Sequence, residues 1–183
     1  MITANRISPV GGHICQCDLF KDIIVIEEVN IIGNQLIKRE IKFPYIICLN
    51  QECDLLSDYR NHQSAGVLKD SSLLHIAIAP VFIFEQFRQG THWGDIFQGR
   101  PIGTDEAKKI RQNEVSRYHY LCFPPEEKFP EMIIDFKHFF TIDRMTLYKQ
   151  LSKRFYSFAP LYKEKISQRF SFYISRIGLP DNS

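Results

Sequence analysis

The stretch between residues 43 and 54 constrains the fold of this chain more than any other. Its first part, from Tyr45 to Leu49, is apolar at every position. Successive side chains of a strand point to opposite faces, so this run predicts a central strand that is buried on both sides. The polar residues 50–54 follow directly, which predicts a strand that ends in a loop of the kind that carries functional sites.

Similar short apolar runs, separated by turn residues, predict a mainly antiparallel sheet. We expect further strands at 13–20, 23–29, 35–41, 73–79, 117–123 and 132–140, with a tight turn at Lys21-Asp22. Residues 50–70 predict an irregular loop with at most one helical turn. Short helices are expected at 81–88, at 104–113 and after Thr141 or Asp143.

Large apolar residues recur at spacings of three and four between Leu161 and Ile177, which predicts an amphipathic C-terminal helix. Together, these patterns predict a mainly β, single-domain chain over residues 1–183. Residues 1–140 would form a small antiparallel barrel with helical insertions, and residues 141–178 would form helices that close one end of it.

The net charge of the chain does not by itself indicate a nucleic-acid partner, because its 23 Lys and Arg residues are nearly balanced by 21 Asp and Glu residues. The segment 137–176 is locally basic, with nine Lys and Arg residues against two acidic ones. Lys153 and Arg154 in this segment are candidate phosphate contacts. The alternative is that these charges form the solvated side of a helix.

The five cysteines are odd in number, and the N-terminus has no signal-peptide pattern. We therefore expect a cytoplasmic protein with free thiols, no membrane segment and no cofactor. His13, Cys15 and Cys17 alternate along the first expected strand, and with Cys48 or Cys53 they could ligate zinc. Because no C-x-x-C pair exists, we expect core cysteines rather than a metal site.

Four segments, in order, resemble the PemK/MazF-like toxins. Gly12-His-Ile with Cys17-Asp-Leu is similar to the opening strand of that family, and residues 43–50 are similar to its Arg-Pro-aliphatic strand. Residues 74–80 resemble its next strand, and residues 132–147 resemble its late strand and helix start. The resemblance implies an SH3-like barrel with a C-terminal helix, a homodimer, and cleavage of single-stranded RNA without a metal.

The positions that carry catalysis in that family hold other residues here. Phe43 stands where the family has its catalytic arginine, and Pro80 or Phe82 stands where it has its threonine. Metal-free RNA cleavage requires a cation and a group that moves the 2′-hydroxyl proton. Arg39 or Arg60 are the candidate cations; the alternative is that both are solvated surface residues.

Asp54 is the candidate general base, with capping of a following turn as its alternative role. The adjacent Cys53 is not expected to be a nucleophile, because the carboxylates on both sides of it disfavour a thiolate.

Arg117, Tyr118 and Tyr120 are candidates for holding an unpaired base by stacking, with core packing as the alternative for one face of that strand. Two functions follow. The first is a toxin-type barrel that binds, and in its active form cleaves, single-stranded RNA. The second is a catalytically inactive interaction module whose partner is an inhibitor protein of a toxin–antitoxin or defence system.

Overall fold

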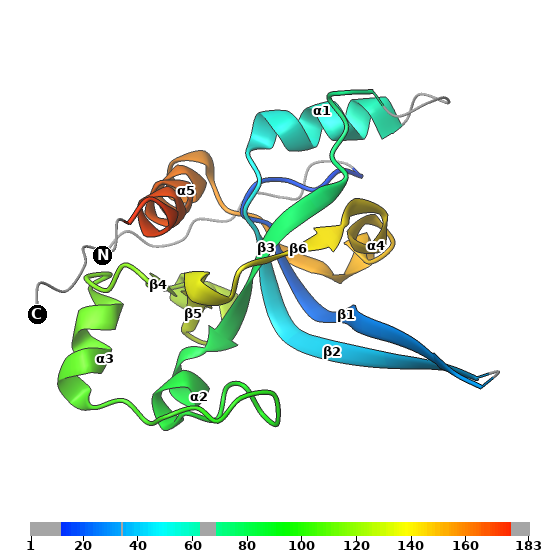
Figure 1. Ribbon diagram of the computed structural model, residues 1–183. Helices are drawn as coiled ribbons and strands as arrows, with labels where there is room; N and C mark the ends of the chain where they lie inside the picture. Colours follow the sequence, from blue (N-terminus) through cyan, green and yellow to red (C-terminus); the bar gives the residue numbers. More distant parts are fainter. Residues whose placement is uncertain (1–11, 34, 63–68, 177–183) are drawn as a thin grey trace, which may run out of the picture.

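The computed structural model describes residues 12–33, 35–62 and 69–176. Seven strands form one sheet (Figure 1): β1 Leu19–Ile32, β2 Gln35–Cys48, β3 His75–Ile83, β4 Tyr118–Leu121, β5 Met132–Asp135, β6 Phe140–Asp143 and β7 Arg154–Tyr156. The helices are α1 Glu52–His62, α2 Phe84–Gln89, α3 Thr104–Arg111, α4 Arg144–Tyr148 and α5 Pro160–Ile174. Three 3-10 turns complete the described part of the chain: η1 Pro125–Glu127, η2 Phe136–His138 and η3 Leu151–Lys153.

The sheet is antiparallel throughout and runs in the order β4-β5-β3-β2-β1-β7, with β6 also paired to β3. This is a mainly antiparallel β half-barrel with helices, so the predicted fold class is confirmed at that level. No pairing between β7 and β4 closes the sheet within the described ranges. No helix in this part of the chain has both the length and the apolar character needed to span a membrane.

The central strand predicted at residues 45–49 is buried on both faces. Ile46 and Cys48 belong to one apolar cluster, and Ile47 and Leu49 belong to another on the opposite side of the sheet. Residues of α2 and α3 complete the first cluster, whereas Tyr162 and Ile166 of α5 complete the second. This covering explains why the strand could be apolar at every position.

The boundaries predicted for the first two strands, at 13–20 and 23–29, are wrong. Lys21-Asp22 is not a turn: Asp22 adopts a φ of 54° inside β1, and the strand continues to Ile32. β2 offers one continuous partner, so both expected pieces pair with it and form a single long hairpin. In Figure 1 this hairpin projects away from the helices. Residues 13–18 precede β1 and are not a strand.

Two other expectations are corrected. The segment expected to be an irregular loop contains α1, which is mostly polar and buries mainly Leu55 and Asp58. The strand expected at 132–140 is split into β5 and β6 by η2, and both parts pair with β3. The helices predicted near 104–113 and from Leu161 are confirmed, although the expected end of the second one, at residues 177 and 178, lies outside the described residues. Asp143 caps α4 by accepting the Thr146 N–H at 2.8 Å.

His119 of β4 gives the fold a measurable acid sensitivity. Its side chain is 1% exposed, and burial together with nearby Arg169 lowers its pKa to about 3. The unfolded chain binds a proton near the ordinary pKa of 6.5, so stability falls as the pH drops below that value. Between about pH 7 and about pH 4.5 this histidine should cost roughly 2–3 kcal/mol.

We expect His119→Phe to lose that part of the acid sensitivity, measured as urea unfolding free energy at the two pH values. His75→Phe, which replaces an exposed histidine on β3, is the matched control. Equal acid destabilisation of the two variants would contradict this assignment.

Candidate functional site

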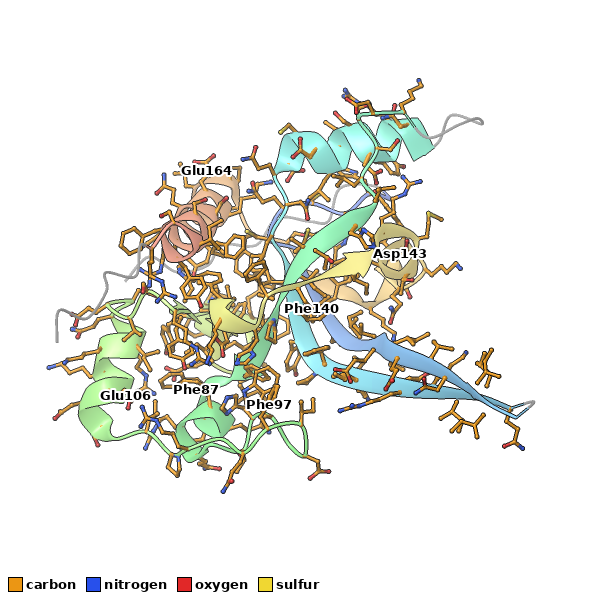
Figure 2. The ribbon with its side chains drawn as sticks, viewed as in Figure 1. Phe87, Phe97, Glu106, Phe140, Asp143 and Glu164 are labelled. Atoms are coloured by element: carbon orange, nitrogen blue, oxygen red, sulfur yellow. The ribbon has the colours of Figure 1, made fainter. Side chains whose placement is uncertain are left out.

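Two adjoining hollows open where the loop after α2 approaches the root of the β1–β2 hairpin. The hollow beside the hairpin has a volume of about 520 Å³, and the one beside β4 has a volume of about 420 Å³. Trp93, Phe97, Lys137 and His138 line both. We call the two hollows together the groove. Figure 2 shows Phe97 at this place, and Glu164 of α5 lies on the other side of the molecule.

The loop at residues 90–99 is held by a close approach of two glycines. Gly90 has a φ of 75°, and a Cβ on Gly99 would lie 2.1 Å from the Gly90 carbonyl oxygen. Only glycine fits both positions. The glycines therefore fix the two ends of the loop that presents Trp93 and Phe97.

Aromatic rings form the floor of the groove and one of its exposed walls. Trp93 is buried and packs against Phe82, Phe97 and His138, with ring centroids 4.7, 4.9 and 4.7 Å away. The Phe97 side chain is 51% exposed. An exposed ring supported by buried rings is a suitable surface for stacking a planar group.

The sheet places Lys137 and His138 in the groove through the bulge formed by η2. Asp135 is fully buried and accepts the backbone N–H of Lys137 at 3.0 Å. It also binds Arg117 through two hydrogen bonds of 2.8 and 2.6 Å. His138 Nε2 lies 3.9 Å from the same carboxylate. Bulges commonly redirect side chains next to functional sites.

Two histidines in the groove are neutral near neutral pH. Burial lowers the pKa of His92, against an opposing effect of Asp135. Burial likewise lowers the pKa of His138, which also lies beside Asp135. A neutral imidazole can accept a proton, so the groove contains candidate general bases.

Three exposed cations surround these rings. Lys137 is exposed, Arg39 forms an ion pair with Glu27 at 2.9 Å, and Arg100 binds Glu106 at 2.8 Å. Both arginines are at least 70% exposed, and such surface pairs contribute little energy. An anionic ligand could therefore draw the arginines away from their partners.

The structure brings together three of the residues singled out from the sequence. Arg39, Arg117 and Tyr118 line the groove, although Arg117 is bound to Asp135. Burial raises the pKa of Tyr118 to about 12, so its hydroxyl stays protonated. Tyr120 is only 3% exposed and packs edge-on against Phe84.

The other candidates lie elsewhere. Asp54 and Arg60 are exposed on α1, at the opposite end of β3 from α2 (Figure 1). Lys153 donates to the Asp22 carbonyl at 2.7 Å, and Arg154 binds Asp18 at 2.8 Å. The basic C-terminal segment therefore uses these two charges in contacts within the chain.

Sequence reasoning missed the residues that define the groove. His92, Trp93 and Phe97 lie in a glycine-rich segment, and the available signal was a run of rings around the single tryptophan of the chain. His138 was read as part of a continuous strand, because nothing in the pattern marks the bulge at η2.

The fold and this site define a β-rich half-barrel with a ring-lined, partly cationic groove. No protein family model, curated protein or solved structure matches the chain.

Proposed function

We propose that the groove binds single-stranded RNA and cleaves it without a metal. The observation that carries the proposal is the presence, around the groove, of an exposed ring, an exposed lysine and neutral histidines. Base stacking on aromatic side chains and phosphate contacts from lysine are how proteins hold single strands. A duplex keeps its bases stacked on each other, so Phe97 would discriminate against it.

The groups that would cleave the RNA backbone lie around His138. Its Nε2 faces Asp135, which leaves the other ring nitrogen to accept the proton of a ribose 2′-hydroxyl. The 2′-oxygen would then bond to the adjacent phosphorus, the bond to the 5′-oxygen would break, and solvent would protonate the leaving oxygen. Lys137 would stabilise the negative charge that develops on the phosphate oxygens.

The resemblance to PemK/MazF-like toxins is part of this proposal. The half-barrel is compatible with an SH3-like barrel, and Phe43, at the position of the catalytic arginine of that family, lines the hairpin side of the groove. Its ring packs 4.9 Å from that of Phe140. The catalytic groups would thus have moved from that strand to the neighbouring bulge.

Substitution of Phe97 tests whether single-stranded RNA binds in the groove. We expect Phe97→Ala to weaken the affinity for a fluorescein-labelled single-stranded RNA oligonucleotide about tenfold, because one base loses its stacking partner. Fluorescence anisotropy titration measures this directly.

Phe172→Ala is the matched control, since Phe172 is a similarly exposed phenylalanine on α5 that does not line the groove. A duplex of the same sequence should bind more weakly than the single strand. Equal losses in the two variants, or equal binding of the duplex, would rule out the groove as the RNA site.

The hairpin favours a second function, self-association. The register places Ile24, Ile26, Val29 and Ile31 opposite every second residue of β2, so these four side chains share one face. Their exposed fractions run from 39% to 74%. In the described part of the chain, β1 pairs with β7 only at Leu19 and Phe20, and side chains of Lys153 and Gln150 bind the backbone of Asp22 and Ile24, so this edge is open beyond Ile24. Two copies of β1 paired antiparallel about a two-fold axis would unite both apolar stripes.

Light scattering coupled to size-exclusion chromatography tests this pairing. We expect a dimer that the double variant Ile26→Lys/Ile31→Lys converts to a monomer, because four charges would meet at the pairing edge. Leu161→Lys/Phe172→Lys, at two exposed apolar positions on α5, should remain dimeric. A monomeric wild-type protein at micromolar concentration excludes the dimer.

A further inference from the structure

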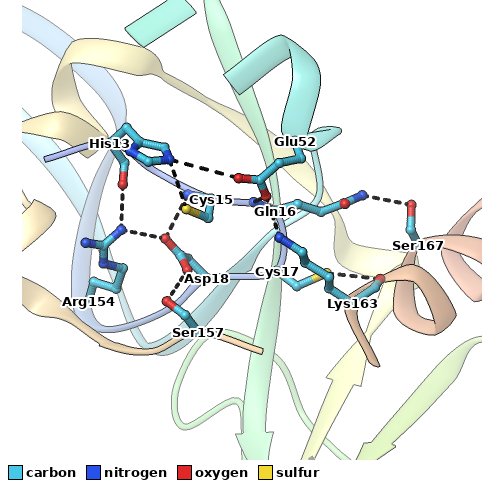
Figure 3. A network of polar contacts seen from close by, with 10 residues as sticks. All are labelled: His13, Cys15, Gln16, Cys17, Asp18, Glu52, Arg154, Ser157, Lys163 and Ser167. Carbon is cyan, nitrogen blue, oxygen red and sulfur yellow. Dashed lines mark hydrogen bonds and ion pairs between the residues drawn. The ribbon is translucent and has the colours of Figure 1, made fainter. Parts of the chain in front are cut away.

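A histidine, a cysteine and a glutamate meet where the chain before β1 crosses the start of α1 (Figure 3). His13 Nε2 lies 3.3 Å from Cys15 Sγ and 4.0 Å from Glu52 Oε1. The three potential ligand atoms all lie within 4.8 Å of one another. None of these residues lines the groove.

We propose that His13, Cys15 and Glu52 bind one Zn²⁺ ion. Imidazole nitrogen, thiolate sulfur and carboxylate oxygen are the ligands that zinc prefers, at roughly 2.0 to 2.3 Å. Tetrahedral coordination at those lengths separates neighbouring ligand atoms by roughly 3.5 Å. The nitrogen–sulfur separation of 3.3 Å already fits, and the separation of 4.0 Å between His13 Nε2 and Glu52 Oε1 exceeds the tetrahedral value by about 0.5 Å.

The surrounding contacts orient the glutamate toward the other two ligands. Its Oε2 accepts hydrogen bonds from the Gln16 N–H at 2.9 Å and from Lys163 Nζ at 2.8 Å. The oxygen that faces His13 is therefore the other one, Oε1. Ligating carboxylates in zinc sites are commonly held by such outer contacts.

The backbone that carries the other two ligands is also fixed. Cys15 donates its N–H to Asp18 at 2.8 Å, and the His13 carbonyl accepts a hydrogen bond from Arg154. Asp18 is fully buried and binds Arg154 as well, so one ion pair anchors both ligand residues.

Cys17 and Cys53 are excluded from this site. Cys17 has a φ of 62°, so it does not continue the alternation expected from the sequence, and its thiol contacts the Lys163 carbonyl. Cys53 is exposed on α1 and contacts Gln51 and Asp54. The set of His13, Cys15 and Cys17 with Cys48 or Cys53, which the sequence offered only as an alternative to core cysteines, is thus replaced in this proposal by one in which Glu52 takes the third place.

Three protein ligands leave one coordination position open. The Glu52 side chain is 36% exposed and borders a hollow of about 520 Å³ between α1 and α5, so solvent can reach the ion. The fourth ligand would be water or an incoming small group.

Cobalt titration of the full chain, after removal of bound metal by a chelator, tests the site. We expect one equivalent of Co²⁺ to give a thiolate-to-cobalt charge-transfer band and the intense visible bands of a four-coordinate ion, and Zn²⁺ to abolish both. Cys15→Ser should lose the charge-transfer band, and Glu52→Gln should weaken Co²⁺ binding at least about tenfold.

Cys53→Ser is the matched control and should retain the full spectrum. Circular dichroism verifies that each variant is folded, and Zn²⁺ should raise the melting temperature of the wild type but not that of Cys15→Ser. Absence of the band in the folded wild type, or loss of the band in Cys53→Ser instead of Cys15→Ser, would overturn the proposal.

Discussion

His138→Ala should reduce the rate of single-stranded RNA cleavage by about 10²- to 10⁴-fold, the range by which a general base accelerates a reaction. The imidazole lies in the groove, is neutral near neutral pH because burial lowers its pKa, and is held beside Asp135. The measurement is the rate of product formation from a labelled oligonucleotide without added metal. Products should carry a 2′,3′-cyclic phosphate and a 5′-hydroxyl.

A measurement of RNA affinity distinguishes the loss of the general base from a loss of the whole RNA-binding site. RNA affinity of His138→Ala should stay within about threefold of the wild type, since the substitution removes a proton acceptor and keeps Phe97 and Lys137. His75→Ala, at an exposed position on β3, should cleave at the wild-type rate. A His138→Ala protein that cleaves normally would assign the cleavage to another residue or to a contaminant.

Arg144→Met should destabilise the protein by about 3–5 kcal/mol, because it leaves a buried carboxylate without its cation. Asp58 of α1 is fully buried and accepts hydrogen bonds from Arg144 at 2.6 Å and from the Leu73 N–H at 2.9 Å. The Arg144 side chain is only 8% exposed. Urea unfolding measures this decrease in the free energy of unfolding.

Arg100→Met is the control for this ion pair. Its partner Glu106 is at a similar distance, but Arg100 is 74% exposed, so the loss should be under about 1 kcal/mol. The double variant Arg144→Met/Asp58→Asn should recover part of the stability, because it removes the unpaired charge as well. A loss below about 1 kcal/mol for Arg144→Met alone would mean that the pair contributes no more than a surface pair.

The apolar pattern predicted the parts of the fold in which burial dominates. The run at 45–49 was predicted to be covered on both faces, and α5 was predicted from its spacing, because burial of an apolar residue leaves a direct mark in the sequence. α1 was not predicted, because its surface is mostly polar and because a buried polar residue, Asp58, holds it against the rest of the protein. The long hairpin was missed because pairing with β2 overrides the turn preference of Lys21-Asp22.

The candidate site could be predicted only in part. Arg39, Arg117 and Tyr118 were predicted to be site residues and do line the groove. His92 and His138 come from separate segments, and their approach depends on the glycine contact and on the bulge at η2. Such long-range geometry has no signature in local periodicity, which also explains why Asp54, and neither of these histidines, was named as the candidate general base.

Photo-cross-linking of a 4-thiouridine-containing single-stranded RNA, followed by tryptic digestion and mass spectrometry, identifies the segments of the protein that contact RNA. If the groove is the RNA site, adducts will concentrate in the peptides that span residues 89–108 and 138–144, which contain Trp93, Phe97 and His138. Adducts confined to α1 or to residues 154–176 would contradict the account.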